Sequence, residues 1–137
     1  MIRTVVDTNI AVSAFLWGGT PREILDAARR EVITIFTSPA LIAELDEVLS
    51  GPKFAARITR AGSSVSELLE DYRALARVVR PTAPQPVVRD PDDDMVIACP
   101  LTAKAEIIVS GDEDLLVLGS YQNVTILSAT QMRSRLR

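Results

Sequence analysis

The sequence predicts an α/β protein of three layers, α/β/α, in which a central, mainly parallel sheet carries helices on both faces. Short segments rich in β-branched residues alternate with segments whose apolar residues recur every three or four positions. This alternation is typical of parallel sheets, because each crossover between parallel strands has room for a helix. The length of 137 residues suits a single domain, and we expect residues 1–137 to form it.

Four segments are predicted to be strands because each is short and mostly β-branched or apolar. They are residues 4–6, 32–36, 106–110 and 124–127. The helices are predicted from apolar stripes and from capping residues, prolines or glycines at their ends. They are residues 10–16, 21–28, 39–50, 54–58, 65–79, 95–105, 112–118 and 130–136. The prolines between residues 81 and 91 indicate an irregular surface crossover.

Local signals also predict how individual helices begin. Asn9 is expected to cap the first helix, and Thr20 the second. Ser64 and Glu67 have the spacing of a capping box at the start of the fifth helix, on whose apolar face we place Val79.

Composition excludes several classes of function. The chain has no histidine and a single cysteine, which removes Ser-His-Asp triads, Cys-His pairs and ordinary zinc sites. The 15 Lys and Arg against 18 Asp and Glu give a net charge of −3, unlike a generally basic nucleic-acid-binding protein. No apolar run approaches the roughly 20 residues of a membrane span, and residues 1–30 lack the features of a signal peptide. We therefore expect a cytoplasmic protein without membrane insertion, whose chemistry depends on carboxylates.

Carboxylates follow two of the predicted strands. Asp7 comes directly after the first strand and Asp112 shortly after the third, at the ends where parallel sheets bind ligands. Asp94 ends a run of aspartates before a predicted helix, and Glu44 borders the apolar stripe of another. Clustered carboxylates repel each other unless a cation offsets their charge, and oxygen ligands suit Mg²⁺ or Mn²⁺. The pattern favours metal-assisted attack of water on a phosphoryl group.

Each of these acids also has a purely structural interpretation. Asp7 can support a turn, Asp94 can stabilise a helix N-terminus, and Asp112 can cap a helix. Glu44 can be an ordinary residue on the flank of its helix. No single acid decides between the two interpretations, so the metal site is predicted from their co-occurrence in an otherwise apolar setting.

Four blocks of sequence occur in an order that matches a known family. They are residues 5–9 (VVDTN), 38–49 with Glu44 inside, 89–94 (RDPDDD) and 109–116 (VSGDEDLL). This arrangement resembles the PIN-domain nucleases and, more narrowly, the VapC-like toxin components of type II toxin-antitoxin pairs. The resemblance covers nearly the whole chain. It implies a PIN-like, Rossmann-like fold and an Mg²⁺- or Mn²⁺-dependent endoribonuclease that hydrolyses single-stranded RNA.

The resemblance also carries roles over to individual residues. The catalytic acids of the family match Asp7, Glu44, Asp94 and Asp112, and its metal ligands match Asp7, Asp94 and Asp112. Supporting positions match Asn9, Ser110 and Asp114. The chain departs from the family at Cys99 and Pro100, because the helix there is usually unbroken in relatives. We expect Pro100 to kink this helix and to shift Asp94.

Partners are suggested by a basic ridge and by the resemblance. Lys53, Arg57 and Arg60 recur at i, i+4 and i+7, which suits an RNA backbone and equally a solvated helix face. Family members commonly form homodimers and are inhibited by a cognate antitoxin protein, so the resemblance implies both for this chain.

Other functions remain open alternatives. A catalytically weak PIN domain would bind RNA or a protein without cutting. A response-regulator receiver is disfavoured because Leu127 is followed by Ser128 instead of by a sequence with the expected lysine. A haloacid-dehalogenase phosphatase would need an aspartate two residues after Asp7, where Asn9 stands.

Overall fold

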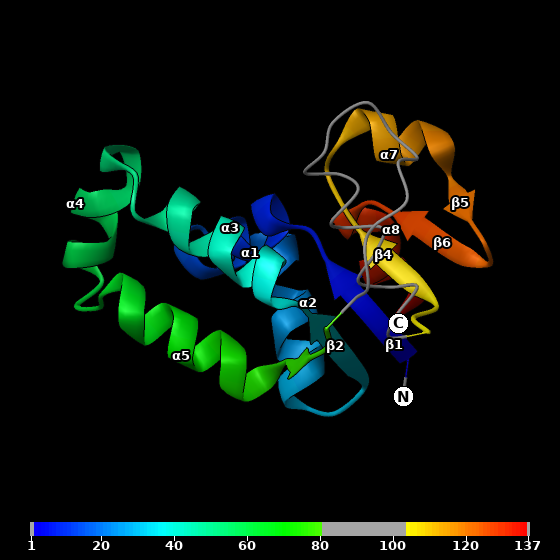
Figure 1. Cartoon of the computed structure of the whole chain (residues 1–137), viewed down its shortest axis with the longest axis horizontal. Coiled ribbons are helices and arrows are strands. Elements are labelled where there is room, and N and C mark those ends of the chain that lie inside the picture. Colours follow the sequence, from blue (N-terminus) through cyan, green and yellow to red (C-terminus); the bar gives the residue numbers. More distant parts are fainter. Residues whose placement is uncertain (1, 81–103, 137) are drawn as a thin grey trace.

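The structure of the chain, a computed structural model, describes residues 2–80 and 104–136 (Figure 1). Its described residues form one six-stranded sheet in the order β3-β2-β1-β4-β6-β5. The strands are β1 (Ile2–Val6), β2 (Ile33–Thr37), β3 (Arg77–Val78), β4 (Ile107–Val109), β5 (Ser120–Tyr121) and β6 (Val124–Leu127). All neighbouring pairs are parallel except β5 with β6. The predicted mainly parallel sheet is therefore confirmed.

Seven helices are seen in these residues. They are α1 (Thr8–Leu16), α2 (Gly19–Arg29), α3 (Pro39–Leu49), α4 (Pro52–Arg60), α5 (Val65–Leu75), α7 (Glu113–Leu118) and α8 (Ala129–Arg135). Figure 1 shows α4 at the end of the molecule farthest from β5 and β6. In none of the described segments is a helix both long and apolar enough to cross a membrane.

The core divides into two apolar clusters because successive side chains of each strand point to opposite faces of the sheet. Val6 and Val109 pack in the larger cluster, together with residues of α1, α2, α3 and α8. Val5 and Ile108 pack in the smaller cluster, to which α7 contributes Leu115. Full burial of one such side chain contributes about 1.5–3 kcal/mol. Helices thus cover both faces of the sheet, as the three-layer prediction requires.

Two helices begin earlier than predicted. The N-cap of α1 is Asp7, not Asn9, because the carboxylate of Asp7 accepts a hydrogen bond from the Thr8 N–H at 2.7 Å. The N-cap of α2 is Gly18, not Thr20. Gly18 has a φ of 75°, a conformation that costs glycine little, so the chain turns there directly from α1 into α2.

The fifth predicted helix also needs correction at both ends. Ser64 accepts a hydrogen bond from the Glu67 N–H, but the Glu67 carboxylate accepts one from the Ser63 hydroxyl at 3.4 Å instead of completing the predicted capping box. The helix ends at Leu75, and Val79 follows the short strand β3. The Val79 N–H donates to the Thr37 carbonyl at 2.8 Å, so pairing with β2 replaces helix at this point.

Candidate functional site

The candidate site lies where the direction of the strand order reverses. The chain runs outward from β1 through β2 to β3, and then returns to the other side of β1 with β4 and β6. Open parallel sheets bind ligands at such a switch point, beyond the carboxyl ends of the strands. Val6 of β1 pairs with Val109 of β4, so the residues that follow these two strands are brought together. Those residues include Asp7 and Asp112.

Asp7 is held in place from three directions. Its backbone N–H donates to the Val109 carbonyl at 2.9 Å, which extends the ladder between β1 and β4. Its carboxylate accepts hydrogen bonds from the Thr8 N–H at 2.7 Å and from the Ser110 hydroxyl at 2.8 Å. The side chain is buried. This carboxylate is therefore fixed and poorly hydrated.

Ser110 connects the two aspartates. Its hydroxyl donates to the Asp7 carboxylate and accepts from the Asp112 N–H at 3.0 Å. Ser110 is fully buried, whereas Asp112 is half-buried. The carboxylate of Asp112 accepts from the Asp114 N–H at 2.8 Å and forms the N-cap of α7. The structural interpretation of Asp112 as a helix cap is thus correct, whereas Asp7 caps α1 instead of supporting a turn. Both residues still lie at the switch point.

The electrostatics of the site disfavour an ionised Asp7. Burial raises the pKa of the Asp7 carboxyl above its usual value, and the negative charge of Asp112 raises it further. Hydrogen bonds from Ser110 and Thr8 offset part of that rise. A carboxylate with these surroundings gains more than an exposed one from a nearby cation.

Glu44 reaches the same place from α3. Its carboxylate accepts a hydrogen bond from the Thr8 hydroxyl, 36 residues away in sequence. Thr8 is buried at the start of α1, and Glu44 is half-buried. The structure thus brings three of the four predicted acids, Asp7, Glu44 and Asp112, to one place.

These acids line a cavity of about 500 Å³. Its lining consists of Asp7, Thr8, Asn9, Glu44, Glu47, Val48, Gly51, Lys53, Phe54 and Asp112. Thr8, Glu47 and Phe54 line this cavity although they were not predicted as site residues. Thr8 had a signal, because it stands inside the D-T-N segment, whereas only the packing of α4 near α1 brings Phe54 to the cavity.

Comparison with known proteins identifies the family of this chain. A family model described as PIN domain matches residues 3–114. The chain belongs to the PIN-domain family. Proteins of this family are nucleases, and the matched residues include Asp7, Glu44 and Asp112.

This PIN domain is similar to known proteins in sequence and in structure. It is 31% identical over 118 residues to the uncharacterized protein MJ1680 of Methanocaldococcus jannaschii, covering 85% of this chain and 75% of that protein. Its fold is similar to a chain of VapBC2 from Rickettsia felis, crystallised with a DNA fragment from their promoter. That match has a TM-score of 0.64 at 14% identity over 93% of this chain and 98% of that chain. PAE2754 from Pyrobaculum aerophilum matches with a TM-score of 0.59 at 16% identity, over 98% and 89% of the chains.

The remaining predicted site residues are distributed around the PIN-domain cavity. Asn9 is exposed and lines it. Asp114 is exposed on α7 and donates its backbone N–H to Asp112. Asp94 lies outside the described residues, as do Cys99, Pro100 and nearly all of the predicted helix 95–105. Within residues 2–80 and 104–136, no group of three or more His, Cys, Asp and Glu is arranged to hold a metal ion.

The predicted basic ridge lies on α4 but its members differ in surroundings. Lys53 lines the cavity. Arg57 donates its Nε–H to the Leu16 carbonyl at 2.6 Å, which ties α4 to the end of α1. Arg60 is exposed in the last turn of α4.

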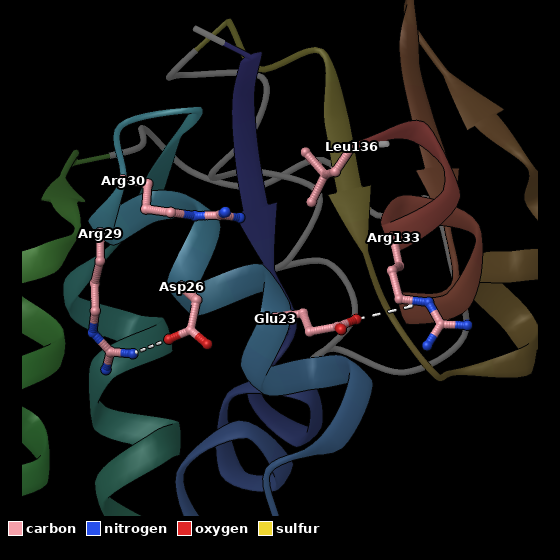
Figure 2. Close-up of a pocket in the computed structure, with 6 residues that line it drawn as sticks. All are labelled: Glu23, Asp26, Arg29, Arg30, Arg133 and Leu136. Carbon is pink, nitrogen blue, oxygen red and sulfur yellow. Dashed lines mark hydrogen bonds and ion pairs between the residues drawn. The ribbon is translucent and has the colours of Figure 1, made fainter.

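A larger cavity of about 670 Å³ lies between α2 and α8 and differs in its charges (Figure 2). Two of its carboxylates are paired with arginines. Asp26 accepts from Arg29 at 2.7 Å, and Glu23 lies 3.7 Å from the Nε of Arg133. Because these charges are already offset by arginine, this cavity does not call for a cation.

Proposed function

We propose that this PIN domain is a divalent-metal-dependent endoribonuclease that hydrolyses phosphodiester bonds of single-stranded RNA. The observation that carries the proposal is the joint placement of Asp7 and Asp112 at the switch point of the sheet, connected by the buried hydroxyl of Ser110. Family membership supports nuclease chemistry in general. The choice of RNA and the dependence on Mg²⁺ or Mn²⁺ rest on the sequence resemblance and on the oxygen ligands of the site.

The residues present fit a hard divalent cation. All polar side-chain atoms that Asp7, Glu44 and Asp112 offer are oxygens. A carboxylate has about four lone-pair sites, and Asp7 uses one on each oxygen for Ser110 and Thr8. We propose that Asp7 and Asp112 hold Mg²⁺ or Mn²⁺ together with Asp94. When bound, such an ion lowers the pKa of its water and stabilises the leaving oxygen.

The neighbouring residues are proposed to orient the acids. Ser110 binds one oxygen of Asp7 and the backbone N–H of Asp112, and the Asp114 N–H binds the Asp112 carboxylate, so each carboxylate is held by a hydrogen bond. Thr8 donates to Glu44 and directs that carboxylate towards the cavity, where it is proposed to act as the fourth catalytic acid. Asn9 and Asp114 are proposed to support this arrangement, and Lys53, Arg57 and Arg60 to bind the RNA backbone.

The proposed biological role is that of the toxin in a toxin-antitoxin pair. The resemblance to VapC-like proteins supports a cognate antitoxin, a homodimer and a cytoplasmic location. The likeness of the fold to a chain of VapBC2 supports the same assignment. Co-expression with the product of an adjacent small reading frame, followed by sedimentation analysis, tests both the partner and the dimer. Recovery of a monomer that forms no complex would contradict this part of the proposal.

The activity is tested by incubating purified protein with a pool of RNAs in Mn²⁺, Mg²⁺ or EDTA. We expect cleavage in single-stranded regions with metal and none with EDTA. Asp7→Asn is expected to lower the cleavage rate by about a hundredfold or more, because it weakens the metal site. Glu23→Gln, which removes a carboxylate from the cavity between α2 and α8, is the matched control and should cleave normally.

Two results would contradict the proposed function. Cleavage that is equally fast in EDTA would exclude a metal-dependent nuclease. Binding of RNA without cleavage in either metal would instead support the alternative of a catalytically weak PIN domain that acts as a binding module.

A further inference from the structure

An aromatic pair, an exposed Trp17 and a half-buried Phe54, lies beside the acidic cavity, where the end of α1 meets the start of α4. Trp17 is the C-cap residue of α1, and Phe54 belongs to the first turn of α4. Their rings pack edge to face, with centroids 5.6 Å apart and planes at 81°. Trp17 is 54% exposed. The pair therefore leaves a large part of an indole ring open to solvent.

Two cations border these rings. The guanidinium of Arg57 lies 4.6 Å from the centre of the Trp17 ring, and the ammonium of Lys53 lies 5.4 Å from that of Phe54. Arg57 also donates to the Leu16 carbonyl, so its guanidinium is fixed beside Trp17. Each ring of the pair thus has one cation beside it, although the chain as a whole is negative.

The patch is continuous with the acidic cavity. Phe54 and Lys53 line the same cavity as Asp7 and Asp112. Trp17 in turn contacts Phe54, so the aromatic surface leads outward from the proposed metal site.

The exposed Trp17 differs from Phe15 and Tyr72, which pack against each other. Phe15 packs against Tyr72 at 5.9 Å between centroids, and Tyr72 is buried in the larger core cluster. Burial of an aromatic ring stabilises a fold. The single tryptophan of this chain is exposed, so its ring contributes less to the free energy of unfolding than a buried ring would. A base stacked on Trp17 would bury the ring face, and this burial would stabilise the complex.

We propose that Trp17 and Phe54 form a stacking platform for a base of a single-stranded nucleic acid, whose backbone is bound by Lys53 and Arg57. This inference rests on the proposed nuclease function and adds a positioning role for residues outside the acidic site. A groove that combines aromatic rings with cations is the usual way to bind single strands without a strict sequence. The same cations disfavour a purely apolar protein partner as the occupant.

The direct test uses the intrinsic fluorescence of Trp17, the only tryptophan of the chain. Oligouridylate and oligoadenylate of eight nucleotides are titrated in EDTA, so that no strand is cut. An abasic sugar-phosphate strand of the same length is the matched ligand control. We expect saturable quenching by strands with bases and little change with the abasic strand. Equal quenching by both, or none by either, would overturn the proposal.

Variants provide a second test, by fluorescence anisotropy of a labelled oligonucleotide in EDTA. Trp17→Ala should bind roughly 5- to 150-fold more weakly, the loss of one stacked base, and Trp17→Phe should lose less. Val117→Ser replaces an 86% exposed residue of α7 and should bind as the natural chain does. An affinity of Trp17→Ala within twofold of the natural chain would overturn the proposal. Circular dichroism shows whether each variant is folded.

The two proposals can fail separately. If strands quench Trp17 in EDTA but are not cut in Mn²⁺, the nuclease function is wrong while the stacking platform stands. If Mn²⁺-dependent cleavage is lost in Asp7→Asn but Trp17→Ala binds and cuts normally, the nuclease function stands and the platform is wrong.

Discussion

The two cavities of this PIN domain both contain carboxylates, but the groups that contact these carboxylates differ. Between α2 and α8, Glu23 and Asp26 each lie next to an arginine (Figure 2). At the switch point, Asp7 and Asp112 are instead held by hydroxyl and backbone N–H groups. In the larger cavity each carboxylate is paired with an arginine, whereas Asp7 and Asp112 form no ion pair within residues 2–80 and 104–136, although Lys53 lines the same cavity. The arrangement of charge, more than cavity size, therefore identifies the site.

Replacement of Asp112 gives the largest expected effect. Asp112→Asn should lower the rate of RNA cleavage by about a hundredfold, since it removes a proposed metal ligand. Asparagine also caps helices well, so the free energy of unfolding should change by less than about 0.5 kcal/mol. Cleavage rates and urea denaturation measure the two effects. Asp26→Asn, in the other cavity, is the control and should leave cleavage unchanged; equal losses in both variants would end the distinction between the cavities.

Ser110→Ala tests the connection between the two aspartates. The variant lacks the hydroxyl that donates to Asp7 and accepts from the Asp112 N–H. We expect a 10- to 100-fold lower cleavage rate, roughly the effect of losing an outer partner of a metal ligand. The buried N–H of Asp112 loses its acceptor, so unfolding should cost about 1–3 kcal/mol less. Ser110→Thr keeps the hydroxyl and should recover part of the rate. Full activity of the alanine variant would show that the connection has no role in the chemistry.

The two cavities should also differ in the sign of a stability change. Burial raises the pKa of the Asp7 carboxyl, so its ionised form costs stability in metal-free protein at neutral pH. In EDTA, Asp7→Asn should raise the free energy of unfolding by on the order of 1 kcal/mol. In Mn²⁺ the same variant should cleave RNA about a hundredfold or more slowly. The asparagine oxygen can still accept from the Thr8 N–H. Glu23→Gln should instead be neutral or slightly destabilising. Destabilisation by Asp7→Asn would contradict the view that the buried charge of Asp7 is unfavourable without a bound cation.

The smallest effect is expected at the rim of the larger cavity. Arg133→Ala removes the ion pair with Glu23 and a hydrogen bond to the Thr20 hydroxyl at 3.3 Å. Both side chains of the pair are partly exposed, so the loss should stay below about 1 kcal/mol. RNA cleavage should not change. Urea denaturation and the cleavage assay check both statements, and a large loss of activity would indicate that this cavity belongs to the functional surface.

The central strands were predictable because their sequence pattern is local. The strands β1, β2, β4 and β6 each contain consecutive apolar or β-branched residues, and their burial follows from that pattern. The two-residue strands β3 and β5 were not predicted. In β3, both Arg77 and Val78 are exposed, so the pairing with β2 and not the residues themselves defines the strand. Such edge pairing depends on the partner strand.

Site residues that directly follow a strand could be predicted from the sequence, whereas those placed by the packing of helices could not. Asp7 and Asp112 were expected at the same sheet edge because parallel neighbouring strands end there. The contact between Thr8 and Glu44 depends on how α3 packs near α1, which no local pattern reports. The same holds for Trp17, which meets α4 only through the tertiary fold.

The most direct test of the central claim is the anomalous diffraction of Mn²⁺ in crystals of the natural chain and of Asp7→Asn. We predict a peak within coordination distance of the Asp7 and Asp112 carboxylates, and its loss in the variant. A peak only between α2 and α8, or no peak in crystals of protein that cleaves RNA with Mn²⁺, would contradict the claim that these aspartates share a metal ion.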